Sequence, residues 1–343
     1  MRVTIAIFAL CMQWTAARVT FTHSVILDEF DFKGQSSLTV DGLCADTCRI
    51  YASITPESRK LTDNILIQTA KGFKTLSAVA DLRDASTNQK LFLEINNIPI
   101  LTIVNGNSGD AAGPLVIYIV NQAATYYGSA QVYEAEGLDR APAPVQSITV
   151  LSARPFTITE ASYAPMGVIA RLAGFDALGY MTETCPNLYY LIAQPFPGFS
   201  LTINAPIVSL LYDVQQFHFP AGEIKATIGI SHTNQMGQSG FINSPGYHGC
   251  TGKPAYRSSL YDMTSPILEQ ITDPNPQSIS YDVVTNSDRD HALIVRNSAG
   301  TEIGEFSDTG DVAQMSQVTD KSLKFSWTPT VDTYFLVRYN STA

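Results

Sequence analysis

The residues able to support acid–base, nucleophilic or metal chemistry are scattered and form no recognised catalytic motif. Gly237-Gln238-Ser239-Gly240 lacks the Gly-x-Ser-x-Gly spacing of a nucleophile elbow. No glycine-rich phosphate loop follows a predicted strand and opens a helix. None of the five histidines is at ligand spacing from another: His23, His218, His232, His248 and His291. We therefore expect no catalysis, no metal and no cofactor.

Carboxylates do occur in close pairs, and these keep a hydrolase among the alternatives. The pairs are Asp28-Glu29 with Asp31, Glu134 with Glu136, and Asp308 with Asp311. Glycoside hydrolysis needs two carboxylates across one cleft, which proximity in the chain does not establish. Glu134 and Glu136 would share one face of a strand, although a solvated strand end explains them equally well.

The cysteines favour disulfide bonds. Cys11 lies in a predicted leader, which leaves Cys44, Cys48, Cys185 and Cys250. Four cysteines allow three pairings. The spacing from Cys44 to Cys48 fits neither a CxxC redox motif nor a zinc site. We predict a local Cys44–Cys48 bridge and a longer Cys185–Cys250 bridge.

The N-terminus is typical of a secretory signal peptide. A positive charge at Arg2 precedes an apolar stretch, Val3 to Trp14, and the small-residue exit Thr15-Ala16-Ala17. We predict cleavage after Ala17 and a secreted, extracellular protein. The sequon at Asn340 predicts N-glycosylation and fits the same route. No later segment is long and apolar enough for a spanning helix, so we expect no membrane insertion.

Composition narrows the class of partner. The 343 residues are 45% hydrophobic and only 15% charged, with a formal net charge of −10. An acidic chain lacks the basic footprint that nucleic acid requires, and it does not favour adsorption to anionic lipid. The partner is expected to be an extracellular protein or a glycan of unknown identity.

Two tyrosine pairs are candidates for stacking on a ligand: Tyr126-Tyr127 and Tyr189-Tyr190. Adjacent residues of a strand face opposite sides, so one member of each pair could stack on a sugar or a protein. Packing into the two faces of a layer explains both pairs as well, and we favour it.

Most of the chain shows the period and composition of strands. Short runs such as Leu91–Ile95, Ile98–Val104 and Leu115–Val120 are rich in β-branched residues and are separated by Asn, Gly and Pro. Val168–Leu178 is the main helical candidate, weakened by Gly174. We predict a mainly β protein of consecutive antiparallel β-sandwich domains. The predicted divisions are a leader (1–17), an N-terminal β domain (18–137), a Pro-containing linker (138–144), a central β-rich domain (145–236) and a C-terminal β-sandwich (237–343).

The last block resembles a CUB-like domain. Gly240-Phe241-Ile242-Asn243-Ser244-Pro245-Gly246-Tyr247 is similar to the family's opening motif, and Lys321–Trp327 with Tyr334–Tyr339 is similar to its closing strands. The flanking cysteines of the family are absent, because this block contains only Cys250. The layout resembles the divergent CUB-like proteins secreted by nematodes, which implies an antiparallel β-sandwich and a link to innate defence. The early Glu of calcium-binding members has no counterpart, so the resemblance implies no tight calcium site.

The leading hypothesis is therefore a secreted extracellular binding or recognition protein without catalysis. A carbohydrate-binding, lectin-like protein is the first alternative. A secreted hydrolase built from distant carboxylates is the second.

Overall fold

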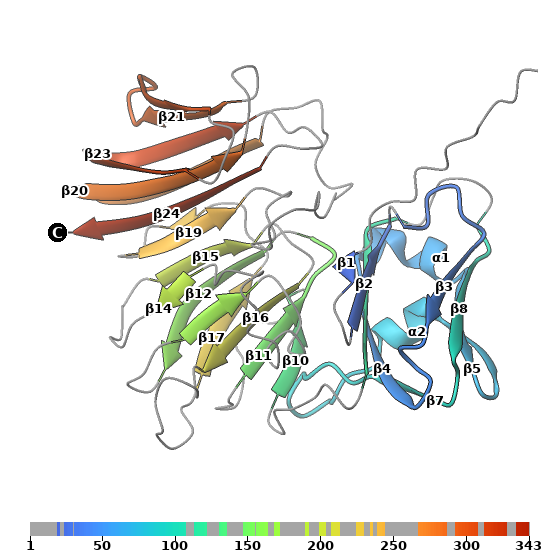
Figure 1. Ribbon diagram of the computed structural model, residues 1–343. Helices are drawn as coiled ribbons and strands as arrows, with labels where there is room; N and C mark the ends of the chain where they lie inside the picture. The colour runs from blue at the N-terminus through green and yellow to red at the C-terminus, as the bar shows by residue number, and fades with distance from the viewer. Residues whose placement is uncertain are drawn as a thin grey trace, which may run out of the picture.

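The computed structural model is mainly β, with several antiparallel sheets, as the sequence predicted (Figure 1). It describes residues 19–20, 24–29, 31–107, 113–121, 130–135, 147–154, 156–163, 168–171, 189–191, 199–203, 207–212, 224–229, 234–235, 239–243, 267–286, 292–307, 312–327 and 334–342. The predicted leader and linker lie outside these residues.

The N-terminal region, residues 19–121, contains two sheets. The five-stranded sheet has the order β1-β2-β9-β4-β7. Its strands are Val19–Thr20, Ser24–Asp28, Leu115–Asn121, Thr47–Ile54 and Leu93–Asn96 in that order. The four-stranded sheet has the order β3-β8-β5-β6. Its strands are Ser37–Asp41, Ile100–Asn105, Ile65–Thr69 and Gly72–Thr75.

One apolar core lies between these two sheets. Alternate residues of β3 are buried, namely Leu38 and Val40, and they share this core with Ile50 of β4 and Ile117 of β9. Three short helical segments connect the strands, namely η1 (Pro56–Ser58), α1 (Arg59–Thr62) and α2 (Leu76–Ala80), and α2 adds Leu76, Val79 and Ala80 to the core. The side chain of Thr75 caps α2 by accepting a hydrogen bond from the Ala78 backbone N–H.

The central strand β9 is buried on both faces. Leu115 through Val120 are all buried, which explains the unbroken apolar run in the sequence. Its second face packs with Tyr51 of β4 against the next part of the chain, in a core that includes Val132, Leu151 and Ile207. The N-terminal region therefore contacts the following sheet through an apolar interface.

That following sheet has the order β10-β11-β16-β13-β14. Its strands are Ala130–Glu134, Ser147–Leu151, Ile207–Tyr212, Val168–Arg171 and Tyr189–Leu191. We expected Ala130–Glu134 to belong to the N-terminal domain, but β10 pairs in parallel with β11 and extends this second sheet. The predicted domain boundary at residue 137 separates β10 from its partner β11. The sequence gives no local signal for this pairing, because parallel strands are not joined by a tight turn.

The remaining strands form one ten-stranded sheet that crosses the expected boundary at residue 237. Its main path is β17-β12-β15-β19-β24-β20-β23-β21-β22. The first three strands are Ile224–Gly229, Phe156–Tyr163 and Phe199–Ile203. The next three are Ser239–Asn243, Tyr334–Thr342 and Ile267–Asn286. The last three are Val312–Trp327, Leu293–Asn297 and Glu302–Phe306. The tenth strand, β18 (Asn234–Gln235), pairs with β20 beside this path.

The parallel pairing of β15 with β19 joins the central strands to the C-terminal ones. Strand β19 is therefore joined to the preceding β15 through backbone hydrogen bonds. Within the C-terminal strands, a core around Tyr281 and Phe325 includes the packed rings of Trp327 and Phe335.

The helix predicted over Val168–Leu178 is wrong at its start. Val168–Arg171 forms strand β13, paired with both β14 and β16. The β-branched residues Val168 and Ile169 suit that position between two strands. Residues 172–178 lie outside the described residues.

Candidate functional site

Two features of the described residues have the chemistry of a functional site. One is a buried charged cluster where the N-terminal region meets the second sheet. The other is the outer face of the four-stranded sheet, on the opposite side of the N-terminal region. The carboxylate of Glu134 is the centre of the first, and the ring of Phe73 is the most exposed apolar group of the second.

Local structure brings the charged cluster together. Residues Arg83 and Lys90 form an isolated bridge across a short loop. The loop turns at Asp84, whose carboxylate accepts backbone hydrogen bonds from Ser86 and Thr87. Ser53 follows Tyr51 by two residues on β4, so both side chains face the second sheet. On β10 the same alternation turns Glu134 and Val132 toward the N-terminal region.

Glu134 is bonded on both carboxylate oxygens. Its Oε1 accepts a hydrogen bond of 2.6 Å from Ser53 Oγ, and its Oε2 lies 2.9 Å from Lys90 Nζ. Arg83 also pairs with Oε2, and Lys90 Nζ donates to the backbone carbonyl of Ala80 at the end of α2. The cluster thus contains two cations and one anion, and Lys90 and Glu134 are each held by more than one partner.

Burial determines what this cluster can do. The side chains of Lys90 and Glu134 are 0% and 3% exposed. Desolvation lowers the pKa of the Lys90 ammonium, while the Glu134 charge opposes that shift. A serine beside a carboxylate and a lysine has the groups for nucleophilic chemistry, but Ser53 is only 1% exposed. A substrate therefore has no access to Ser53, and the cluster serves the junction.

Backbone contacts reinforce the same junction. Ser53 Oγ accepts a hydrogen bond from the Ala153 N–H at 3.2 Å, and the Lys90 N–H donates to the Val132 carbonyl at 2.8 Å. At the surface, Arg154 pairs with Glu57 and lowers the pKa of that carboxyl to about 2. Polar bonds and the apolar core around Tyr51 thus join the N-terminal region to the second sheet.

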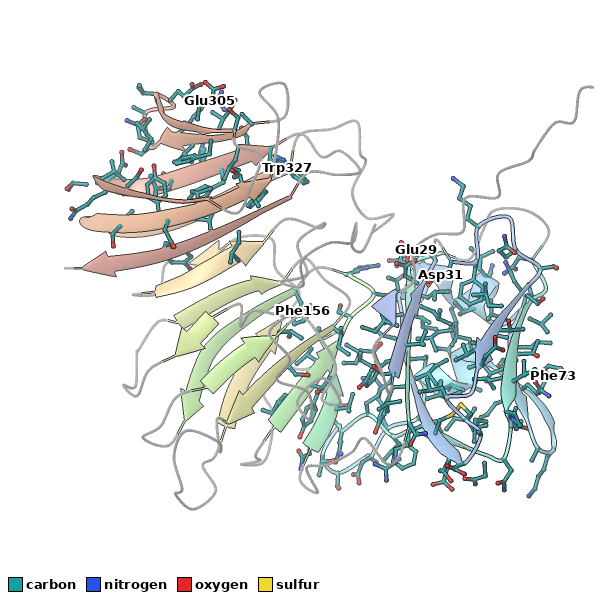
Figure 2. All side chains as sticks on the ribbon, in the orientation of Figure 1. Glu29, Asp31, Phe73, Phe156, Glu305 and Trp327 are labelled. Atoms are coloured by element: carbon teal, nitrogen blue, oxygen red, sulfur yellow. A yellow bond between two sulfur atoms is a disulfide. The ribbon has the colours of Figure 1, made fainter. Side chains whose placement is uncertain are left out.

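The outer face of the four-stranded sheet is exposed and mostly uncharged, unlike the buried charged cluster. We define the outer face as the outward-facing residues of its four strands: Ser37, Thr39, Asp41, Leu66, Gln68, Phe73, Thr75, Ile100, Thr102 and Val104. Phe73 and Ile100 are 58% and 56% exposed, the highest values among the large hydrophobic residues that the structure describes. Figure 2 shows Phe73 on the side of the N-terminal region that points away from the rest of the chain.

A tight hairpin places Phe73 on this face. Gly72 has φ of +123°, a conformation that glycine adopts without strain, and it ends the turn between β5 and β6. Thr69 Oγ1 stabilises the turn by donating to the Gly72 carbonyl at 3.0 Å. The register then sets Phe73 directly opposite Gln68.

Register aligns the outer face in rows across the strands. One row contains Ser37, Val104, Leu66 and Thr75 as consecutive partners. In the next, Phe73 is opposite Gln68, and Thr39 is opposite Thr102. The two pairs are joined because the Thr102 N–H donates to Gln68 Oε1 at 3.1 Å. Asp41 is the only charged residue of the outer face.

The structure gives mixed outcomes for the residues that the sequence singled out. The local Cys44–Cys48 disulfide is present, buried at one end of the N-terminal core. Cys185, Cys250, Tyr126, Tyr127 and Glu136 lie outside the described residues. Tyr189 and Tyr190 belong to strand β14, opposite Ala170 and Ile169, and their side chains are not described. These positions stay predictions.

The predicted glycosylation site and members of two carboxylate groups also lie among the described residues. Asn340 lies in β24, where its backbone pairs with Ser239 on one side and Ser280 on the other, so its glycosylation stays a prediction. Asp28 and Asp31 exchange hydrogen bonds between each backbone N–H and the other's carboxylate, which is a turn arrangement. Glu134 is not at a solvated strand end, because the N-terminal region covers it.

Sequence reasoning did not identify Phe73, Gln68, Lys90 or Arg83. For the first two, the available signal was the alternation of Ile65 and Ile67 with Leu66 and Gln68, which does not extend through the hairpin turn to Phe73. For Lys90 and Arg83 the sequence held no signal, since their partner Glu134 is more than forty positions away. Within the described residues no cluster of three or more His, Cys, Asp or Glu could hold a metal. No helix among them has the length and apolar character to cross a membrane.

Comparison with known proteins does not place the chain in a family. No family model and no curated protein matches it. One solved structure found is the M60 catalytic domain with two CBM51 domains of Clostridium perfringens ZmpB, at 9% identity and a TM-score of 0.18. The alignment covers 93% of this chain and 33% of that one, so the chain spans about a third of its length. Another is a DUF4785 family protein of Legionella pneumophila, at 8% identity, a TM-score of 0.18, and coverage of 93% and 79%.

Proposed function

We propose that the chain is a secreted, non-catalytic binding protein whose ligand contacts the outer face of the four-stranded sheet. The observation that carries this proposal is the exposure of Phe73 and Ile100 on one strand-built surface whose only charged residue is Asp41. Scattered exposed apolar residues are ordinary, but a large aromatic ring held outward by a tight turn on a regular sheet is a defined contact point.

The rest of the described chain supports binding over catalysis. The polar cluster best equipped for acid–base chemistry is enclosed at the junction, as its 3% exposed Glu134 illustrates. An enzyme site needs convergent titratable groups in an accessible cleft. The outer face has no such convergence, since its polar groups are hydroxyls, one amide and the single carboxylate of Asp41.

Secretion is part of the proposal. It is supported by the signal-peptide pattern at the N-terminus and by the Cys44–Cys48 disulfide, which suits an oxidising compartment. A CUB-like C-terminal block and a role in innate defence also belong to the proposal, and they rest on the sequence resemblance at Gly240 to Tyr247 and in the closing strands.

A retention assay tests the binding role without knowledge of the ligand. Fluorescently labelled mature protein is incubated with extracellular matrix or cell-wall material and washed. We expect the wild type to be retained and the Phe73→Ser/Ile100→Ser variant to be lost. Ile303→Ser is the matched control, because Ile303 is 36% exposed on β22, a strand of a different sheet. Equal retention of all three proteins, or no retention of the wild type, would contradict the proposal.

A further inference from the structure

We infer that the ligand of the outer face is a neutral, unbranched glycan that lies across the strands along the row from Phe73 to Thr39. This inference rests on the binding role proposed above and adds the chemical class of the ligand and its direction.

The outer face has no basic residue, which disfavours polyanionic ligands. Asp41 at one corner is the only ionised group among its ten residues, and Lys74 points to the other side of the sheet because it pairs with the buried Ile67. A nucleic acid or a sulfated polymer requires several cationic contacts to offset its own charge. A neutral ligand needs no cationic contacts, so the lack of Lys and Arg on the outer face does not weaken its binding.

The outer face places one exposed aromatic ring at the end of a line of hydrogen-bonding side chains. Phe73 is followed across the strands by Gln68, Thr102 and Thr39, while Leu66 and Val104 occupy the neighbouring row. A protein interface typically has a contiguous apolar centre with aromatic and Arg anchors. A pyranose ring instead presents an apolar C–H face and a rim of hydroxyls. One sugar unit can therefore stack on Phe73, while the units that follow it meet the hydrogen-bonding groups of Gln68, Thr102 and Thr39.

The polar side chains of the row are set in position. Gln68 Oε1 accepts a backbone hydrogen bond from Thr102, which fixes the amide across the gap between β5 and β8 and leaves its NH₂ group two donor hydrogens. Thr102 and Thr39 are opposite one another on β8 and β3. The row spans three strand spacings, or roughly 14 Å. A rigid row of this length favours an extended chain over a single sugar.

An oligosaccharide array with the full mature protein decides the inference. The probes are unbranched neutral oligosaccharides of increasing length, together with sulfated and uronic-acid oligosaccharides. We expect binding to neutral probes that strengthens with length and levels off once the probe exceeds the row. Phe73→Ala should weaken that binding at least fivefold and Phe73→Tyr should preserve it, since the stacking surface is retained. Gln68→Ala should weaken it by a smaller factor, and Ile303→Ser should leave it unchanged.

The outcomes separate this inference from the binding role. Preferential binding to charged probes would overturn the inference of a neutral glycan. Binding to neutral probes that Phe73→Ala leaves unchanged would overturn it as well. Phe73-dependent retention on extracellular material without binding to any oligosaccharide also overturns the glycan, while the binding role stands. If the wild type is neither retained on extracellular material nor bound to any oligosaccharide, both the binding role and the glycan inference are overturned.

Discussion

Lys90 Nζ lies 2.9 Å from Glu134 Oε2, and the two residues come from the N-terminal region and the second sheet. Both side chains are withdrawn from solvent, and Ser53 bonds the other carboxylate oxygen. The bond therefore connects two parts of the structure that the sequence assigns to one predicted domain, residues 18–137. Burial at this junction also makes the cluster of Ser53, Lys90 and Glu134 inaccessible to a substrate.

Removing one partner of this pair should destabilise the junction. Glu134→Leu leaves the Lys90 ammonium without its counter-ion in a buried site, which we expect to cost about 3–5 kcal/mol of unfolding free energy. Lys90→Met combined with Glu134→Leu should recover much of that loss, because no fully buried charge remains unpaired and Arg83 is partly exposed to water. Urea unfolding followed by circular dichroism gives the free energies.

The exposed ion pair of the same junction is the matched control. Glu57→Gln removes the partner of Arg154 at the surface and should leave the unfolding midpoint close to the wild type at neutral pH. A loss at Glu57 as large as that at Glu134 would show that burial is not what makes the Lys90–Glu134 pair important.

Tyr51 should make the chain sensitive to alkaline pH. Burial against Tyr118 and the second sheet raises the pKa of its hydroxyl to about 12, although nearby Arg49 opposes the shift. The unfolded chain releases this proton near pH 10, so stability from Tyr51 is complete below pH 10 and is lost as the pH rises toward 12. The loss should be about 2–3 kcal/mol for two pKa units.

A comparison with Tyr51→Phe isolates this effect from that of other tyrosines. The difference in unfolding free energy between the two proteins should change between pH 10 and 12 in favour of the variant. Parallel stability curves across that range would mean that Tyr51 is not held in its protonated form by the interface.

The N-terminal pattern predicts a specific mature end. Expression in a secreting host should yield protein in the medium that begins at Arg18 or within a few positions of it. Intact-mass spectrometry reads this directly. Protein that retains Met1 and stays inside the cell would refute secretion, while leaving the outer face available for binding.

Particular residues explain how far the sequence predicts the fold. Leu115–Val120 was recognised as a strand because apolar, β-branched residues fill it, and the structure adds that both faces are buried. The sequence does not indicate the start of β20, because Pro274 and Pro276 are unfavourable within a strand. The structure accommodates them at an irregularity between Thr272 and Gln277. The parallel partnership of β10 with β11 has no local signature.

The sites were harder to predict than the strands. The Cys44–Cys48 bridge is local, so spacing alone was informative. Phe73 and Gln68 become neighbours of Thr102 and Thr39 only through strand register, which the sequence does not specify between distant strands. Glu134 looked like a solvated strand end because its cover, Lys90 and Arg83, comes from a distant loop.

Fluorescence at position 73 tests the central claim most directly. The chain contains only two tryptophans, Trp14 in the predicted leader and Trp327, which is buried. Phe73→Trp therefore adds an exposed reporter to the outer face, with Ile303→Trp as the control on the other sheet. On addition of solubilised extracellular material that binds the wild type, the emission of Phe73→Trp should shift to shorter wavelength as the ring leaves water, and that of Ile303→Trp should not. Binding with no shift at position 73 would contradict the assignment of the outer face as the ligand surface.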